Sequence, residues 1–193
     1  MSKSILDMSM SLDGYIADDN DYLGGEDGER LHHWASADGG SAEAGPVREF
    51  EAEWKAAGSV LAGRRTAELM DHWGGSHDGA PIFVPSHRPP PPAARWGYPL
   101  VTYVNDGIES AMAQAKAAAG DRDVQLRGGY TAQEALRAGV LDEIQIHLIP
   151  VLLGRGRRLF DVLPSEIELE LVRVIDTPQA THIRYRVRRP ASS

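Results

Sequence analysis

The feature of this sequence that most constrains its fold is a regular alternation of short apolar segments with amphipathic ones. The apolar segments have the length and composition of buried strands, and they are residues 59–62, 81–85, 100–104 and 124–126. Apolar periodicity and helix-start signals predict helices at residues 46–57, 63 to about 71, 108–119 and 131–138. Alternating strands and helices imply parallel strands with helices on both faces of the sheet.

The two ends of the chain add strands with a different pattern. Residues 5–12 alternate between apolar side chains and short polar ones, which predicts a strand. Residues 167–171 and 183–187 also alternate, and they predict an antiparallel pair with opposite charges on its exposed face. We therefore expect one α/β domain over residues 1–190, with a mostly parallel central sheet and an antiparallel C-terminal strand.

Composition excludes several classes of protein. A chain of 193 residues that is 42% hydrophobic is long enough for one full core. A formal net charge of −8 argues against nucleic acid as a partner, because phosphate contacts need a concentrated basic surface. The absence of cysteine excludes disulfides and thiolate metal sites, and we predict no metal. No run of about 20 apolar residues is present to span a membrane, so we expect a soluble, cytoplasmic protein.

Glycine, arginine and hydroxyl side chains gather where three predicted strands end. Gly128 and Gly129 follow the strand at 124–126 and precede a helix, where glycines let a backbone approach a phosphate closely. Two other strand ends repeat this arrangement, with Gly63, Arg64, Arg65 and Thr66 at one and Ser86, His87 and Arg88 at the next. Because the carboxyl ends of parallel strands share one edge of a sheet, the pattern predicts a ligand with several phosphates.

Short motifs in this order and spacing resemble the dihydrofolate reductase superfamily, and most closely the branch of the C-terminal reductase domain of bifunctional riboflavin biosynthesis proteins. The resemblance runs nearly from end to end of the chain. It is carried by residues 11–17 (SLDGYIA), 63–66 (GRRT), 128–129 (GG), 140–144 (VLDEI), 150–156 (PVLLGRG) and 159–160 (LF). It implies a single-domain, dihydrofolate-reductase-like three-layer α/β fold with NADPH lying across the strand ends.

The resemblance also implies roles for the residues at those strand ends. Gly63, Arg64, Arg65 and Thr66 would meet the pyrophosphate and the adenosine-side phosphate, and Ser86, His87 and Arg88 would surround the 2′-phosphate and adenine. Arg127, Gly128, Gly129, Tyr130 and Thr131 would contact the pyrophosphate and the nicotinamide ribose, and Ile16 and Ala17 would border the nicotinamide. Relatives carry a cis peptide bond at this glycine pair, so we expect one at residues 127–128 or 128–129.

The substrate side departs from the related reductases. Val47 stands where folate reductases have an acidic residue, and valine can neither bind a pterin ring nor assist protonation. Glu51, one helical turn on, is a candidate replacement, with an exposed helix carboxylate as the alternative. Tyr15 stands where the riboflavin branch commonly has lysine, and Asp13 either orients the substrate or caps its own turn. His147 either donates a proton or has a structural role.

Together these observations predict an NADPH-dependent reductase that transfers a hydride to a small polar heterocycle or carbonyl compound, pyrimidine- or pterin-like. Its candidate catalytic residues are Asp13, Tyr15, Glu51 and His147, and residues 18–45 form a lid over them. An alternative is a protein that binds NADP(H) without turnover, as a sensor or storage partner, and a third is a binder of another phosphate compound. The family branch also gives the expectation of a homodimer.

Overall fold

The computed structural model describes residues 2–18, 26–35, 45–92, 97–161, 163 and 166–188, with the backbone alone at residues 26–28, 46 and 47. The chain divides into two compact units, residues 1–6 with 55–142 and residues 7–54 with 143–193. The expectation of a single domain therefore stays a prediction. Most of the expected lid lies outside the described residues, and within the described ranges no helix is long and apolar enough to cross a membrane.

The main sheet has eight strands in the order β5-β4-β3-β6-β1-β7-β10-β9. These are β1 Ser4–Ser11, β3 Ser59–Ala62, β4 Ile82–Pro85, β5 Val101–Val104, β6 Val124–Arg127, β7 Glu143–Ile149, β9 Leu169–Asp176 and β10 Thr181–Val187. The pairs from β5 through to β1 are parallel. Strand β10 runs antiparallel to both β7 and β9. The predicted α/β fold, with a mostly parallel sheet and an antiparallel C-terminal strand, is confirmed.

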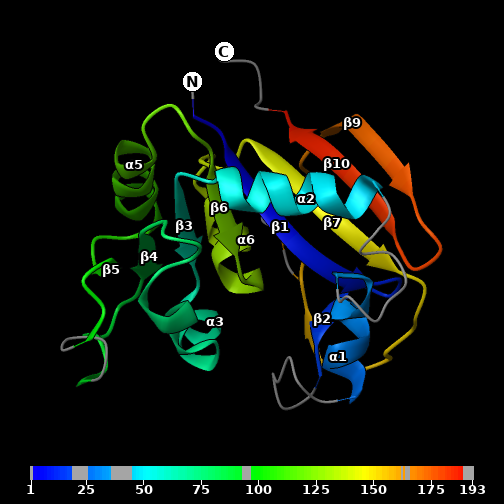
Figure 1. The fold of residues 1–193 in the computed structure, drawn as a ribbon, viewed down its shortest axis with the longest axis horizontal. Helices are drawn as coiled ribbons and strands as arrows, with labels where there is room; N and C mark the ends of the chain where they lie inside the picture. Colours follow the sequence, from blue (N-terminus) through cyan, green and yellow to red (C-terminus); the bar gives the residue numbers. More distant parts are fainter. Residues whose placement is uncertain are drawn as a thin grey trace. The chain divides into compact units, whose positions relative to one another are not determined.

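The first unit contains the parallel strands and the helices between them (Figure 1). Its helical elements are α3 Arg64–Leu69, η3 Asp71–Gly75, α5 Ile108–Ala119 and α6 Gly129–Arg137. Helix α5 packs on β3 and β4, α6 on β6, and α3 on β4. Small and branched side chains of β3, β4 and α3 form a core of Val60, Ala62, Ala67, Ile82 and Val84. This tight packing holds the strand ends and helix starts of the unit in place.

The second unit places helix α2, Gly45–Ala56, over strands β1 and β7. Trp54 of α2 reaches Asp7 of β1, and Phe50 lies against His147 of β7. The unit also holds α1 Glu26–His32, η1 His33–Ala35 and a two-stranded sheet of β2 Tyr15–Ala17 and β8 Arg157–Arg158. Its core consists of Leu31, Trp34, Phe50, Ile149 and Ala180.

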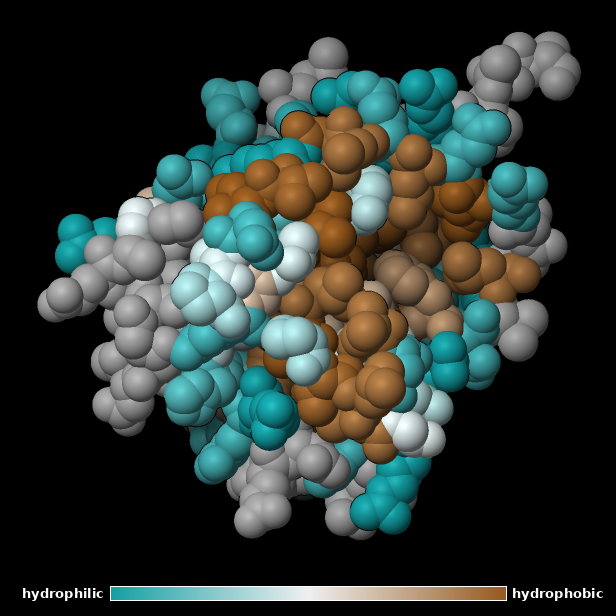
Figure 2. All heavy atoms as spheres, turned by 90° about the vertical axis from the view of Figure 1, so that its right-hand side faces the viewer, coloured by the Kyte–Doolittle hydropathy of each residue, from teal (hydrophilic) through white to brown (hydrophobic). Residues whose placement is uncertain are grey.

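The C-terminal hairpin exposes the face that was expected to be buried. Leu171 and Val174 of β9 are 58% and 51% exposed, and Figure 2 shows a broad apolar surface on this side of the molecule. Arg184, by contrast, faces Glu53 of α2. The expected charged face is exposed along most of the hairpin, as at Arg186. The expectation is wrong at Arg184, because alternation separates two faces without indicating where a helix covers one of them.

Candidate functional site

Two glycine turns of the first unit touch each other at the starts of α3 and α6. The amide of Gly63 donates to the carbonyl of Arg127 at 2.9 Å. A Cβ at Gly63 would lie 2.6 Å from Thr131 Oγ1, and one at Gly128 would lie 2.9 Å from Thr66 Oγ1. Gly128 also has φ +102 and begins α6 without a side-chain cap. The turns therefore exclude side chains, which is what the close approach of a phosphate to the backbone requires.

Arg64 ties the start of α3 to the loop that follows β4. Its Nη1 donates to Ser86 Oγ at 2.9 Å and to the carbonyls of Arg88 and Pro89 at 3.0 and 2.8 Å. Its Nε donates to Glu68 at 2.6 Å. Ser86 Oγ in turn accepts the amide of Arg88 at 3.1 Å. Arg64 and Ser86 thus shape the loop here, and their predicted contacts with phosphate stay a prediction.

The side chains of Arg65, His87 and Arg88 are exposed around these turns. Tyr130 is 63% exposed, whereas Gly129 and Thr131 are buried. The first unit therefore brings its three predicted strand ends together, with exposed cationic groups around a tight glycine turn. The chemistry of this donor set fits an anion with more than one phosphate.

Two local expectations for this turn are wrong. The described residues contain no cis peptide bond, because a positive φ at Gly128 already turns the chain with trans bonds. Helix α6 also starts at Gly129 rather than at Thr131. The apparent capping box at residues 131–134 consequently lies inside the helix.

In the second unit, Asp13 joins the two motifs at residues 11–17 and 150–156. Its carboxylate accepts Ser11 Oγ at 2.6 Å and the amides of Leu153 and Gly154 at 3.1 and 2.7 Å. The Ser11 hydrogen bond contributes most to lowering the pKa of Asp13, and the two amides act in the same direction. Asp13 thus fastens a loop, which matches the capping role more closely than a role in orienting substrate.

The neighbours of Asp13 pack in the same tight arrangement. The Arg158 guanidinium lies 5.1 Å from the ring centre of Tyr15, and its Nη1 is 3.4 Å from the tyrosine oxygen. Ile16 and Ala17 are buried, and a Cβ at Gly156 would lie only 2.1 Å from the Ala17 carbonyl. Whether Ile16 and Ala17 border a nicotinamide stays a prediction.

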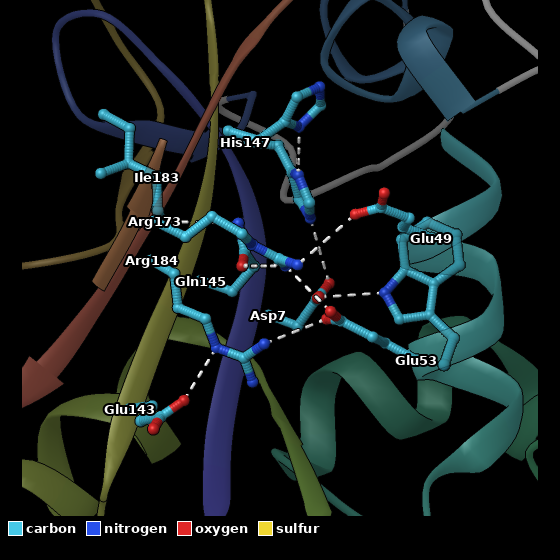
Figure 3. A network of polar contacts seen from close by, with 11 residues as sticks. Asp7, Glu49, Glu53, Glu143, Gln145, His147, Arg173, Ile183 and Arg184 are labelled. Atoms are coloured by element: carbon cyan, nitrogen blue, oxygen red, sulfur yellow. Dashed lines mark hydrogen bonds and ion pairs between the residues drawn. The ribbon is translucent and has the colours of Figure 1, made fainter. Parts of the chain in front are cut away.

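His147 lies in a buried cluster of polar and aromatic groups beneath α2 and η1. Its Nδ1 is 2.6 Å from Nδ1 of His182, and its Nε2 is 3.5 Å from Asp7 Oδ1 (Figure 3). Trp34 stacks on its ring at 4.1 Å between centroids. Both histidines are 1% exposed, so His147 lies on the expected face of its strand, although another side chain covers it.

A pocket of about 460 Å³ lies beside Trp34 in the same unit. Apolar groups and charged groups share its wall: Trp34, Ile149 and Pro150 with Glu29, Arg30, His33 and Gln179. Such a mixture suits a flat, polar organic ligand. Trp34 lines the pocket and also covers His147.

The stability of the protein should depend on the protonation of His182. Burial, reinforced by the neighbouring His147, lowers the pKa of His182 from 6.5 to about 4. The unfolded chain therefore binds the proton first, so stability is complete above pH 6.5 and falls as the pH drops toward 4. By linkage, the free energy of unfolding should be about 2 kcal/mol lower at pH 5 than at pH 7.5.

Urea unfolding of the parent and of His182→Gln at these two pH values measures this contribution. In His182→Gln, most of the difference in the free energy of unfolding between the two pH values should disappear, because glutamine does not titrate. His87→Gln, at an exposed position, is the control and should keep the parent's pH dependence. An unchanged difference in His182→Gln would contradict the assignment.

Comparison with known proteins identifies the family. The model of the RibD C-terminal domain matches residues 2–183. The chain belongs to the RibD C-terminal domain family. A Shewanella sp. PV-4 protein assigned to riboflavin biosynthesis is 25% identical, with a TM-score of 0.76 over 97% of this chain and 99% of that one.

More distant relatives share the fold or part of the sequence. Enterococcus faecalis dihydrofolate reductase, solved in complex with NADP(H) and RAB-propyl, has a TM-score of 0.59 at 15% identity over 96% of each chain. The uncharacterised protein YwjB of Bacillus subtilis (strain 168) is 31% identical over 85 residues, 44% of this chain. The match covers about half the length of that curated relative, at 49%.

This member of the RibD C-terminal domain family carries its buried acidic group on a strand rather than on the helix expected from folate reductases. Val47 lies in α2, where the description covers the backbone alone, and Glu51 is half-buried on the same helix. Asp7 of β1 is 7% exposed and accepts Trp54 Nε1 at 3.0 Å. Asp7 lies in the cluster with His147, 3.5 Å from its Nε2.

Sequence reasoning missed Asp7, Ser9, Trp34 and His182 as members of this cluster. One signal was available, because Asp7 and Ser9 form a polar face on the strand predicted at residues 5–12. That strand, β1, lies inside the sheet, where both faces are normally apolar. Such a polar face needs buried partners. Trp34 Nε1 is one of them and donates to Ser9 Oγ at 2.9 Å.

Proposed function

We propose that this protein is an NADPH-dependent reductase that delivers a hydride to a small polar heterocycle or carbonyl compound, pyrimidine- or pterin-like. The observation that carries the proposal is the pair of touching glycine turns at Gly63 and Gly128, in a chain of the RibD C-terminal domain family. Reduced nicotinamide would supply the hydride when bound. The chain's own residues bind, orient and supply protons.

The first unit supplies the groups that would hold the cofactor. The start of α6 and its glycine turn would accept the pyrophosphate, because helix N-termini and exposed amides attract negative charge. Exposed Arg65 and Arg88 would pair with the remaining phosphates. Thr66 and Thr131 hold the spacing of the two turns, and both stay candidates for direct contact.

The second unit supplies the groups for the substrate. In the pocket, Trp34 provides an aromatic wall, and Arg30 and Glu29 provide charged groups that could bind a polar ring. His147 is our candidate for the proton donor. Asp13 and Tyr15 keep their places on the candidate list, with Asp13 acting through the loop that it fastens.

The cofactor assignment is tested by titrating the protein with NADPH and NADH in parallel. If Arg88 reads the 2′-phosphate, NADPH should bind more tightly by ~1.5–3 kcal/mol, the value of a charged hydrogen bond. Arg88→Ala should remove this preference, and Arg122→Ala, at an exposed position of the same unit, should keep it. Equal affinities for the two cofactors in the parent would contradict the role of Arg88.

One observation favours a second candidate function, the binding of NADP(H) without turnover. His147 is buried under Trp34 and does not line the pocket. A sensor or storage protein would bind NADPH and leave it unoxidised with every compound in a panel of pterins, pyrimidines and quinones. Oxidation with any of them would exclude it.

We also propose that the protein is a homodimer that buries the apolar face of β9. Leu169, Leu171, Val172 and Val174 are all at least 42% exposed, and β9 is at the edge of the sheet. Exposed apolar edge strands are a common site of association. Sedimentation should show a dimer that Leu171→Asp converts to a monomer, whereas Leu100→Asp, at another exposed apolar position, should not. A monomeric parent would contradict the proposal.

A further inference from the structure

The hydrogen bonds around His182 determine which of its nitrogens carries the proton. Thr177 Oγ1 donates to the Ala180 carbonyl at 2.8 Å, so its oxygen can only accept from His182 Nε2, 3.3 Å away. Burial keeps His182 neutral, with a pKa of about 4. A neutral imidazole has one hydrogen. His182 therefore carries it on Nε2 and presents a lone pair at Nδ1.

The same logic assigns the hydrogens of His147. Its Nδ1 lies 2.6 Å from His182 Nδ1, which offers a lone pair, so His147 must be the donor. The proton on Nδ1 is thus held in the hydrogen bond to His182. Nε2 is therefore the ring nitrogen of His147 that can gain or lose a proton. Nε2 has no hydrogen-bond partner among the described residues. It lies 3.5 Å from Asp7 Oδ1, which is long for a hydrogen bond but within ion-pair distance.

Other charged groups near this cluster are paired with one another. Glu53 of α2 pairs with Arg173 of β9 at 2.9 Å and with Arg184 of β10 at 3.2 Å. Arg184 also reaches Glu143 of β7 at 2.8 Å. Figure 3 shows these pairs between α2 and the strands, with Asp7 beside His147. Asp7 is consequently the carboxylate placed to act on Nε2, and its negative charge favours a proton there.

One side chain, Trp34, contacts His147 and also borders the pocket of the second unit. It stacks on the His147 ring and is one of the residues that line the pocket. The indole is held by its hydrogen bond to Ser9. A ligand that displaces the Trp34 ring would meet the His147 side chain, which is 1% exposed with the indole in place.

We propose that Asp7 is a positioning residue that keeps His147 protonated at Nε2, as the proton source for the reduction. The inference rests on the proposed function. Reduction of a C=N or C=O bond consumes one hydride and one proton. The Nε2–H bond of His147 breaks as the N–H or O–H bond of the product forms, which leaves a neutral imidazole that solvent reprotonates.

Nitrogen NMR of ¹⁵N-histidine-labelled protein tests the inference without any need for turnover. At pH 6 both ring nitrogens of His147 should be protonated in the parent, with the signals assigned by His147→Gln. Asp7→Asn should leave Nε2 unprotonated at this pH, and Asp7→Glu should restore it. Glu49→Gln, which removes an exposed carboxylate of the same network, should not change the signals. An unprotonated Nε2 in the parent, or no change in Asp7→Asn, would overturn the inference.

Kinetics separate this inference from the proposed function. Asp7→Asn should lower kcat at least tenfold at unchanged KM, as expected for loss of a general acid. An unchanged kcat in a variant that has lost the Nε2 proton would overturn the inference alone. A parent that binds no NADPH would overturn the proposed function, whatever the NMR signals show.

Discussion

Replacing Arg184 with methionine should destabilise the protein by about 3–5 kcal/mol, because it leaves a buried carboxylate without its cation. Glu143 is 3% exposed, and Arg184 Nε donates to it at 2.8 Å. Arg184 also joins α2 to the sheet through Glu53. Methionine keeps much of the aliphatic part of the arginine side chain. The loss of stability therefore measures the removal of the charge more than the loss of packing.

Arg186 gives a matched control on the same strand. It pairs with Glu170 at 3.2 Å, but the two side chains are 52% and 42% exposed. Arg186→Met should therefore cost less than about 1 kcal/mol. Urea unfolding of both variants measures the contrast, and Glu143→Met in the Arg184→Met background should recover much of the loss. If Arg184→Met and Arg186→Met lose the same stability, the burial of Glu143 does not determine how much stability is lost.

The same hairpin shows where sequence reasoning stops. Alternation correctly predicted two strands with one charged and one apolar face, but the location of α2 decides which face is covered. Arg184 has the same pattern as Arg186 in the sequence, yet only Arg184 faces α2. A local pattern gives side-chain direction, whereas burial depends on an element more than 100 residues away.

The candidate sites divide in the same way. The glycine turns of the first unit were predictable because strand, glycine and helix follow one another directly in the sequence. The cluster around His147 was not, since the partners of His147 come from four other segments of the chain: Asp7, Trp34, Trp54 and His182. No spacing rule links such positions. A polar face on a central strand was the one local indication.

The glycine turn gives the second large effect, and a single helix supplies both the test and its control. Gly128 precedes α6 with φ +102, and Gly139 follows it with φ +66. Alanine at either position should cost about 1 kcal/mol or more from the left-handed backbone. At Gly139 nothing lies within 4 Å of the new Cβ, whereas at Gly128 it would meet Thr66 Oγ1 at 2.9 Å.

Gly128→Ala should therefore lose more stability than Gly139→Ala and should also weaken NADPH binding at least tenfold, because the added methyl separates the two turns that would meet the pyrophosphate. Gly139→Ala should bind NADPH like the parent. Thermal unfolding and an NADPH titration of each variant measure the two effects, and Thr66→Ala in the Gly128→Ala background should relieve the steric part. If Gly128→Ala binds NADPH as tightly as the parent does, the cofactor phosphates bind elsewhere, because this substitution directly alters the backbone of the turn.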